Sequence, residues 1–311
     1  MRLLTFTVNG KTRAGLEVDG RVVDLAAAAA ALPADHRDGA ATLPSDLREV
    51  LEGGEPALRT ARRVLDWAAT ASRSGQSPTG PDGAPLVFNR AEVTFRAPIL
   101  RPGKIICLGL NYADHAAEGG SEPPKAPLLF GKFANAIIGA GEPIVLPKAT
   151  QKLDYEAELA VVIGRRAKLV ALDHALDYVA GYMNLHDVSA RDLQGETSQF
   201  FRGKSGDTFA PCGPYLVTSD DVPDPHALRI RSYVNGELRQ DSNTRQLIFD
   251  VPFLVHHISK TITLEPGDII STGTPSGVGT HRHPPSYLKP GDVVRIEVEG
   301  LGVLENPIVA E

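Results

Sequence analysis

Residues 153–164 read LDYEAELAVVIG, and this stretch decides the fold and the chemistry that the sequence predicts. Polar and apolar residues alternate at first, and an apolar run closed by glycine follows, which is typical of a strand that enters a core. Because side chains alternate between the two faces of a strand, Asp154, Glu156 and Glu158 are expected on one face. Buried carboxylates need a cation, and a divalent metal held by oxygen ligands would supply it. An edge strand with a solvated acidic face is the alternative.

The composition is that of an ordinary globular protein. The chain has 311 residues, of which 42% are hydrophobic and 23% charged, and its formal net charge is -6. This acidic balance argues against nucleic acid or an anionic membrane surface as the main partner. No apolar run approaches the ~20 residues that a membrane span requires. The two cysteines, Cys107 and Cys212, lack metal-type neighbours, so we expect them in the core of a cytoplasmic protein.

A change of character along the chain suggests two domains. Residues 1–25 alternate as strands do, with hairpin signals at Asn9-Gly10 and Asp19-Gly20. Helices are expected at 24–32, 46–51 and 56–71. Residues 72–85 are rich in Ser, Gly and Pro, which indicates a linker. The prediction is therefore a small N-terminal α+β domain with its linker over residues 1–85, and a catalytic domain over residues 86–311.

Short β-type runs, separated by Gly and Pro, characterise the second region. Its helices are expected at 173–185 and 250–260. Its strands are expected at 104–110, 136–139, 156–163, 214–218, 228–234, 269–272 and 293–299. The whole chain is therefore predicted to be α+β and mainly β, without a nucleotide-binding fold.

A histidine and a glutamate three residues apart follow the first of these strands, in the stretch GLNYADHAAE at 109–118. On a helical turn, His115 and Glu118 would lie within hydrogen-bonding reach. A carboxylate beside an imidazole fixes its tautomer and favours its charged form, so the pair could act as a general base on water. An incidental pair on a surface helix is the alternative.

Two further polar clusters could complete a site. In residues 184–194, Asp187 could join Glu156 and Glu158 as a third oxygen ligand of Mg²⁺, and Arg191 could pair with a substrate carboxylate. In residues 202–208, Lys204 could stabilise a developing enolate. Helix capping and a solvated loop lysine are the respective alternatives.

Six motifs in order resemble the fumarylacetoacetate hydrolase family over residues 104–309. They are GLNYADHAAE, LDYEAELAVVIG, HDVSARDLQ, RGKSGDTFAPCGP, STGTPSGVG and YLKPGDVVRIEVEGLG. The resemblance implies a mixed β-sandwich or β-roll catalytic domain and a homodimer. The fourth metal acid of larger members is missing from the stretch at 106–108, so the chain resembles the shorter, three-carboxylate members. Leu110 also departs from acylpyruvase-type members, which often carry Arg at this position.

The same resemblance implies roles for individual residues. Glu156, Glu158 and Asp187 would hold Mg²⁺ or Mn²⁺, and Asp154 would be a structural acid. His115 and Glu118 would activate water, and Lys204 would be the polarising cation. Arg191, Gln194 and Thr274 fall where family members contact substrate.

The expected reaction is hydrolytic cleavage of a C–C bond in a 1,3-diketo acid, either an acylpyruvate-like or a 2,4-diketo-3-deoxy acid. The alternative is a decarboxylase or tautomerase of an oxaloacetate-type 2-oxo acid, because enolate stabilisation by the same metal serves these reactions. A metal-stabilised binding protein without catalysis is a third possibility. The expected ligand in either enzyme is a small anionic acid.

Two histidine pairs remain. His281-Arg282-His283 has the spacing of a metal motif but no third ligand nearby in the sequence, so a rim or lid segment is expected rather than zinc. His256 and His257 lie in an otherwise apolar helix and are expected to pack or cap.

Overall fold

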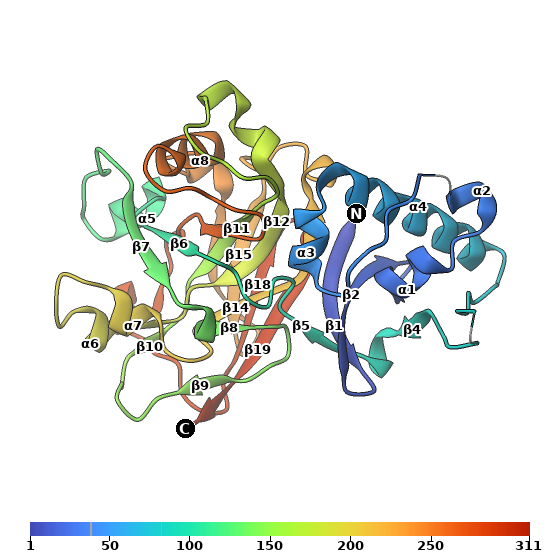
Figure 1. Cartoon of the computed structure of the whole chain (residues 1–311). Coiled ribbons are helices and arrows are strands. Elements are labelled where there is room, and N and C mark those ends of the chain that lie inside the picture. The colour runs from blue at the N-terminus through green and yellow to red at the C-terminus, as the bar shows by residue number, and fades with distance from the viewer. Residues whose placement is uncertain (38, 82) are drawn as a thin grey trace.

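Two β-sheets and a set of short helices make up the described part of the chain, residues 1–37, 39–81 and 83–311, in this computed structural model (Figure 1). The strands of the larger sheet are β1 (Arg2–Val8), β2 (Lys11–Val18), β3 (Arg21–Asp24), β4 (Val87–Asn89), β5 (Thr94–Arg96), β6 (Ile105–Gly109), β7 (Leu128–Lys132), β8 (Ile137–Ile138), β11 (Ala157–Ile163), β12 (Val179–His186), β14 (Ala210–Thr218) and β17 (Ile269–Ser271). They run in the order β4-β3-β2-β1-β14-β12-β11-β17-β6-β7, with β5 on β1 and β8 on β14.

The smaller sheet has the order β16-β15-β18-β19-β9. Its strands are β9 (Ile144–Leu146), β15 (Arg229–Val234), β16 (Glu237–Asn243), β18 (Val293–Val298) and β19 (Val303–Ala310). A separate two-stranded pair is formed by β10 (Leu153–Asp154) and β13 (Ser189–Ala190).

The helices connect and flank the sheets. The α-helices are α1 (Leu25–Ala30), α2 (Ala34–Arg37), α3 (Leu47–Glu52), α4 (Gly54–Arg73), α5 (Ala113–Glu118), α6 (Arg191–Gln194), α7 (Phe201–Lys204) and α8 (Val251–Ser259). The 3-10 helices are η1 (Arg90–Glu92), η2 (Ala134–Ala136), η3 (Leu172–Tyr178), η4 (Ser219–Asp221), η5 (Thr244–Gln246) and η6 (Gly279–His281). None of the helices in the described ranges combines the length and the hydropathy needed to cross a bilayer.

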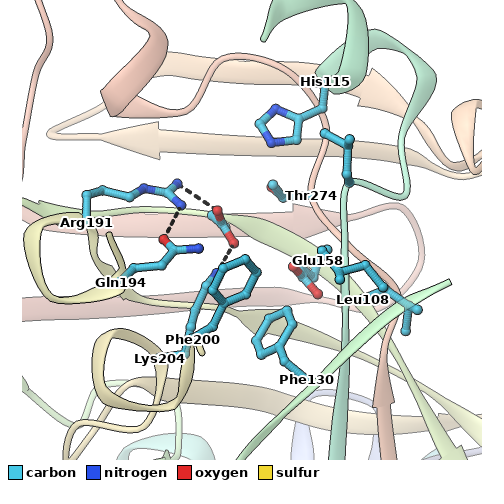
Figure 2. A pocket seen from close by; sticks show the side chains of 13 residues that line it. Leu108, His115, Phe130, Glu158, Arg191, Gln194, Phe200, Lys204 and Thr274 are labelled. Atoms are coloured by element: carbon cyan, nitrogen blue, oxygen red, sulfur yellow. Dashed lines mark hydrogen bonds and ion pairs between the residues drawn. The ribbon is translucent and has the colours of Figure 1, made fainter. Parts of the chain in front are cut away.

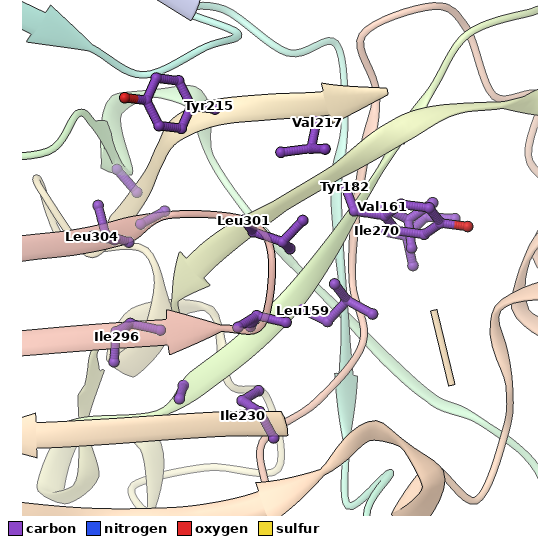
Figure 3. Close-up of a cluster of buried hydrophobic side chains, with 14 of the residues drawn as sticks. Leu159, Val161, Tyr182, Tyr215, Val217, Ile230, Ile270, Ile296, Leu301 and Leu304 are labelled. Carbon is purple, nitrogen blue, oxygen red and sulfur yellow. The ribbon is translucent and has the colours of Figure 1, made fainter. Parts of the chain in front are cut away.

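The central strand β11 supplies both hydrophobic cores, because its side chains alternate between the faces of the sheet. Leu159 and Val161 pack in the core between the two sheets (Figure 3). The other labelled members of this core are Tyr182, Tyr215, Val217 and Ile270 from the larger sheet, and Ile230, Ile296, Leu301 and Leu304 from the region of the smaller one. Ala160 and Val162 face the opposite core, which the N-terminal helices cover. Each fully buried Leu or Val stabilises the fold by about 1.5–3 kcal/mol.

The N-terminal region extends the larger sheet. The predicted hairpin turns are confirmed: Asn9, Gly10, Asp19 and Gly20 all have positive φ, as the two central residues of a type I′ turn require. Strand β1 then pairs with β14, with Leu3 opposite Leu216. The predicted division into residues 1–85 and 86–311 stays a prediction, and Asp82 of the expected linker lies outside the described residues.

The helix predicted at 173–185 is wrong. Residues 172–178 form the 3-10 helix η3, and residues 179–186 form β12, which is buried along its whole length. A strand buried on both faces has no alternation, so its apolar run cannot be distinguished from that of a buried helix. The helix expected at 250–260 is confirmed by α8, and each of the predicted strands overlaps an observed one. The expectation of an α+β, mainly β fold is confirmed.

Candidate active site

Three buried carboxylates meet at the start of β11 and the end of β12. The strands are antiparallel, with Glu158 opposite Leu185, and the N–H of Asp187 donates to the carbonyl of Glu156 at 3.0 Å. This register places the three acids on one face, beyond the last apolar residues of that face. One carboxylate oxygen from each of Glu156, Glu158 and Asp187 lies within 4.8 Å of the other two. The residues predicted to bind metal are therefore brought together.

The charge of this cluster is only partly balanced. Burial alone would raise the pKa of Glu156, but Lys204 and Arg191 outweigh burial and hold the pKa well below its usual range. Burial also raises the pKa of Glu158, and here the neighbouring Asp187 and Glu156 raise it further. Glu158 accepts hydrogen bonds from the Ser271 hydroxyl and from the Gly273 N–H at 3.0 Å. A second positive charge close to Glu158 would therefore stabilise its ionised form.

Two lysines contact Asp187, each at a different carboxylate oxygen. Lys204 Nζ lies 2.8 Å from Asp187 Oδ2 and 2.7 Å from Glu156 Oε2. Lys132 Nζ, at the end of β7, lies 2.7 Å from Asp187 Oδ1. It also donates to the carbonyls of Val188, Phe209 and Lys204. Lys132 therefore fixes both the acid and the backbone of the segment that carries Lys204.

Arg191, the first residue of α6, connects the cluster to a C-terminal loop. Its Nη2 donates to Glu156 at 2.6 Å, its Nε to Asp154 at 2.8 Å and its Nη1 to Gln194 at 3.1 Å. Asp154 also accepts from the N–H groups of Gly279 and Thr280. Asp154 thus has the structural contacts expected of it, and Arg191 keeps two of its five N–H donors for other partners.

The predicted His115–Glu118 pair forms on α5. His115 Nδ1 lies 3.2 Å from Glu118 Oε2, and the other oxygen of Glu118 accepts from the N–H of Gly277 at 2.9 Å. Helix α5 is anchored through Asn111, whose side chain donates to the carbonyls of Thr272 and Phe249. Because Nδ1 faces Glu118, Nε2 is the nitrogen that the ring can present to a substrate.

A cavity of about 260 Å³ unites these groups (Figure 2). Figure 2 shows Arg191 and Gln194 on one side, Glu158 and Leu108 on the other, and His115 reaching toward the space between them. Lys204 and Thr274 also line the cavity, and Leu108, Leu110, Leu128, Phe130 and Phe200 form its apolar wall. The Thr274 hydroxyl already donates to the carbonyl of Ala157 and accepts from Gln240. Closely spaced charged side chains and one apolar wall therefore line the same cavity.

The carboxylate cluster fits a divalent cation. Its donors are all oxygens, which is the ligand type that Mg²⁺ and Mn²⁺ prefer. The acids are buried and closely spaced. Lys204 and Arg191 stabilise the ionised form of Glu156 more than that of Glu158, whose pKa is raised. Glu156, Glu158 and Asp187 are thus the residues that would hold the metal.

Sequence reasoning missed Lys132 and the part played by His281. Lys132 ends the apolar run Leu128–Phe130, and a charged residue at that position was the available signal. His281 Nδ1 lies 3.3 Å from Glu118 Oε2, and its ring centroid is 5.4 Å from that of His115. The H-x-H spacing had drawn attention to His281, but its neighbours come from α5, more than a hundred residues away in the sequence.

Residues 104–309 match the C-terminal domain family of fumarylacetoacetate hydrolases. The chain is 44% identical to the mitochondrial oxaloacetate tautomerase of Xenopus laevis over 315 aligned positions, which cover 99% of this chain and 90% of the relative.

Solved structures give the same family. A fumarylacetoacetate hydrolase from the psychrophilic Exiguobacterium antarcticum is 37% identical with a TM-score of 0.80, and each chain is covered completely. A maleylpyruvate hydrolase from Sphingobium sp. SYK-6, solved with manganese(II) and pyruvate, is 31% identical with a TM-score of 0.74, covering 100% of this chain and 99% of the other. The family match spans about two thirds of the chain and contains every residue of the cavity. The chain therefore belongs to the fumarylacetoacetate hydrolase family.

Proposed function

We propose that this protein is a metal-dependent tautomerase of oxaloacetate or a closely similar 2-oxo diacid. The observation that carries the proposal is the 44% identity, over nearly the whole chain, to an oxaloacetate tautomerase. This was the alternative to the hydrolase that the sequence predicted, and it is supported better. The cavity of about 260 Å³ lies below the 300–1,000 Å³ of sites that enclose drug-sized ligands, which suits a small 2-oxo acid.

The residues of the cavity suit proton transfer next to a carbonyl. A divalent cation held by Glu156, Glu158 and Asp187 would act as a Lewis acid on the 2-oxo group. His115, kept in one tautomer by Glu118, would remove a proton from C3 through Nε2. The C–H electron pair would then form the C2–C3 double bond while the π pair of the C2 carbonyl moves to oxygen, which would take a proton from the His115 imidazolium or from water to give the enol. Lys204 would donate a hydrogen bond to that oxygen while it carries negative charge.

The remaining groups would orient the substrate. Arg191 has two N–H donors left for a carboxylate, and the amide nitrogen of Gln194 is a further donor at the same side of the cavity. The wall formed by Leu108, Phe130 and Phe200 would exclude water from the reacting carbons.

Hydrolysis of a C–C bond is the second candidate. It is favoured by the 31% identity to a maleylpyruvate hydrolase, and the His115–Glu118 pair could equally take a proton from water. The two reactions differ in whether a base must reach a carbon-bound proton or a water molecule. Homodimer formation and a cytoplasmic location stay predictions, and the Xenopus relative is named a mitochondrial protein.

A substrate panel separates these functions. Enol-to-keto exchange of oxaloacetate is followed by the ultraviolet absorbance of the enol, with excess Mg²⁺ or Mn²⁺. Pyruvate release from oxaloacetate and from an acylpyruvate is measured in parallel. Accelerated exchange without pyruvate release supports the tautomerase. Cleavage of the acylpyruvate without accelerated exchange would show that the protein is a hydrolase instead.

A further inference from the structure

Two imidazoles and a carboxylate meet at the rim of the cavity, apart from the three buried acids. His115 Nδ1 lies 3.2 Å from Glu118 Oε2, and His281 Nδ1 lies 3.3 Å from the same oxygen. One ligand atom from each of the three residues lies within 4.8 Å of the other two. From this cluster we infer that His115, Glu118 and His281 form a second metal site, which takes Zn²⁺ or a similar transition-metal cation.

The spacing of the donors fits tetrahedral coordination. Zinc binds His nitrogen and carboxylate oxygen at about 2.0–2.1 Å, so two ligands of a tetrahedron lie about 3.3–3.4 Å apart. Two of the three donor separations, 3.2 and 3.3 Å, are close to this value, and one nitrogen of each imidazole lies within 4.8 Å of the other. A cation could therefore replace the two hydrogen bonds with little movement of the side chains.

The chemistry of the donors separates this site from the buried one. Imidazole nitrogen suits zinc, copper, iron and nickel, whereas Mg²⁺ and Mn²⁺ prefer the all-oxygen set of Glu156, Glu158 and Asp187. Three protein ligands leave a fourth position for water. The side chains of His115, Glu118 and His281 are 12%, 22% and 34% exposed, so a cation can reach them from solvent.

The backbone holds His281 in place before any cation binds. Glu118 accepts from the N–H of Gly277, and Asp154 accepts from the N–H groups of Gly279 and Thr280, immediately before His281. Asp154 is itself fixed by Arg191 at 2.8 Å. The loop is thus tied both to α5 and to the strand pair at the cavity, so the site is preorganised.

A cation at this rim site would compete with catalysis. It would bind Nδ1 of His115 in place of the proton donated to Glu118, so that the ring proton of a neutral imidazole would sit on Nε2 and Nε2 could no longer accept a proton. This effect on activity rests on the proposed function, whereas the binding of the cation does not. Transition-metal availability would then regulate an enzyme whose working metal is bound elsewhere.

The binding test uses the full-length protein with the carboxylate site saturated by excess Mg²⁺. Zn²⁺ affinity is measured by calorimetry, and Co²⁺ is used as a spectroscopic probe, since tetrahedral Co²⁺ absorbs visible light far more strongly than octahedral Co²⁺. The variants are His281→Ala and, as the matched control from the same loop, His283→Ala, whose side chain is exposed. Thermal unfolding confirms that both variants are folded.

We expect one Zn²⁺ per chain in the wild type and in His283→Ala, with the strong Co²⁺ band in both. His281→Ala should bind Zn²⁺ more than about tenfold more weakly, because loss of even an outer-shell partner costs 10–100-fold. Wild-type affinity in His281→Ala, or no Zn²⁺ binding by the wild type, would overturn the site. If the protein binds Zn²⁺ but does not act on oxaloacetate, the result would support the site at His115, Glu118 and His281 and would contradict the proposed function.

Discussion

Lys204 Nζ lies 2.7 Å from Glu156 Oε2, so an ammonium group is bound directly to one of the proposed metal ligands. The same nitrogen contacts Asp187 at 2.8 Å. Lys204 and a divalent cation are therefore attracted by the same two carboxylates. Burial would lower the pKa of Lys204, but Asp187 and Glu156 outweigh burial and raise it, so the side chain stays charged.

Replacing Lys204 by Met should tighten Mg²⁺ binding and weaken catalysis. A unit charge 4 Å away is worth about 4 kcal/mol at an effective dielectric of 20, so affinity should rise by up to about 10³-fold. The turnover number should fall, because the hydrogen bond to the developing enolate is lost. Calorimetry with Mg²⁺ and the enol exchange assay measure the two effects. Weaker Mg²⁺ binding in Lys204→Met would mean that the lysine supports the metal site instead of competing for it.

Removing metal should make the stability of the protein depend on the ionisation of Glu158. The pKa of Glu158 is raised above its ordinary value of 4.5, first by burial and then by Asp187 and Glu156. A raised pKa favours the folded state while the group is protonated, so this contribution is present below 4.5 and is lost as pH rises through the raised pKa. The pKa of Glu156 is lowered, so its ionisation changes the stability of the fold only at pH values below its ordinary pKa of 4.5, a different pH range.

Melting temperatures measured across pH with a chelator, and again with excess Mg²⁺, test this. We expect the metal-free melting temperature to fall as pH rises, and Mg²⁺ or Glu158→Gln to reduce that fall. Gln can still accept the hydrogen bonds of Ser271 and Gly273. If Glu158→Gln leaves the pH dependence as it was, Glu158 is not the group responsible.

His115→Asn and Glu118→Gln should each reduce enol exchange by about 10²–10⁴-fold, the usual contribution of general acid–base catalysis. Both variants should keep the wild-type melting temperature to within a few degrees. His174 and Asp177 form a similar pair at 3.1 Å on the exposed η3, so His174→Asn is the matched control. A His115→Asn protein with more than a tenth of the wild-type rate would require another base.

Lys132→Met should destabilise the fold by about 3–5 kcal/mol, because it removes one partner of a buried ion pair. Lys132 is buried, contacts Asp187 and donates to three carbonyls. Lys168 provides the control, since its exposed ammonium also donates to a backbone carbonyl, that of Thr261. Urea unfolding measures both variants, and Lys168→Met should change the free energy of unfolding by less than about 0.5 kcal/mol. A similar loss of unfolding free energy in the two variants would contradict the prediction that Lys132 stabilises the fold more than Lys168 does.

The two cysteines should be inert in the native protein. Burial raises the pKa of Cys107 well above its usual range, and burial together with Glu142 raises that of Cys212 to about 12. Few thiolates then exist near neutral pH. A thiol-specific disulfide reagent should label both cysteines in urea and neither in the folded protein. Rapid labelling of the folded protein would show that one of the thiols is accessible.

The sequence predicted most of the site because its signals are local. Glu156 directly precedes β11 and Glu158 lies two residues further on in that strand, whereas His115 and Glu118 are three apart on one helix, so spacing alone places each pair. The structure brings Asp187 next to Glu156 and Glu158 although β12 is a strand and not the predicted helix, because the polar cluster at residues 184–194 marks Asp187 independently of secondary structure.

What could not be predicted depends on contacts between distant parts of the chain. Lys132 approaches Asp187 only because β7 lies near the segment that follows β12 and the segment that precedes β14. His281 reaches Glu118 only because the loop around Gly279 is tied to Asp154. Neither relationship has a fixed sequence spacing. The apolar wall of the cavity is likewise built from three separate segments, residues 108–110, 128–130 and 200.

The pairing of β1 with β14 has a consequence for how the chain reaches this structure. Leu3 lies opposite Leu216, so β1 can make these contacts only after a partner more than two hundred residues further along the chain has been synthesised. Contacts of such large sequence separation form slowly, and until then both strands carry unpaired N–H and C=O groups that other chains can bind. We therefore expect the N-terminal strands β1, β2 and β3 to join β14, through β1, late in folding. The newly synthesised chain should be most prone to aggregate before this pairing forms.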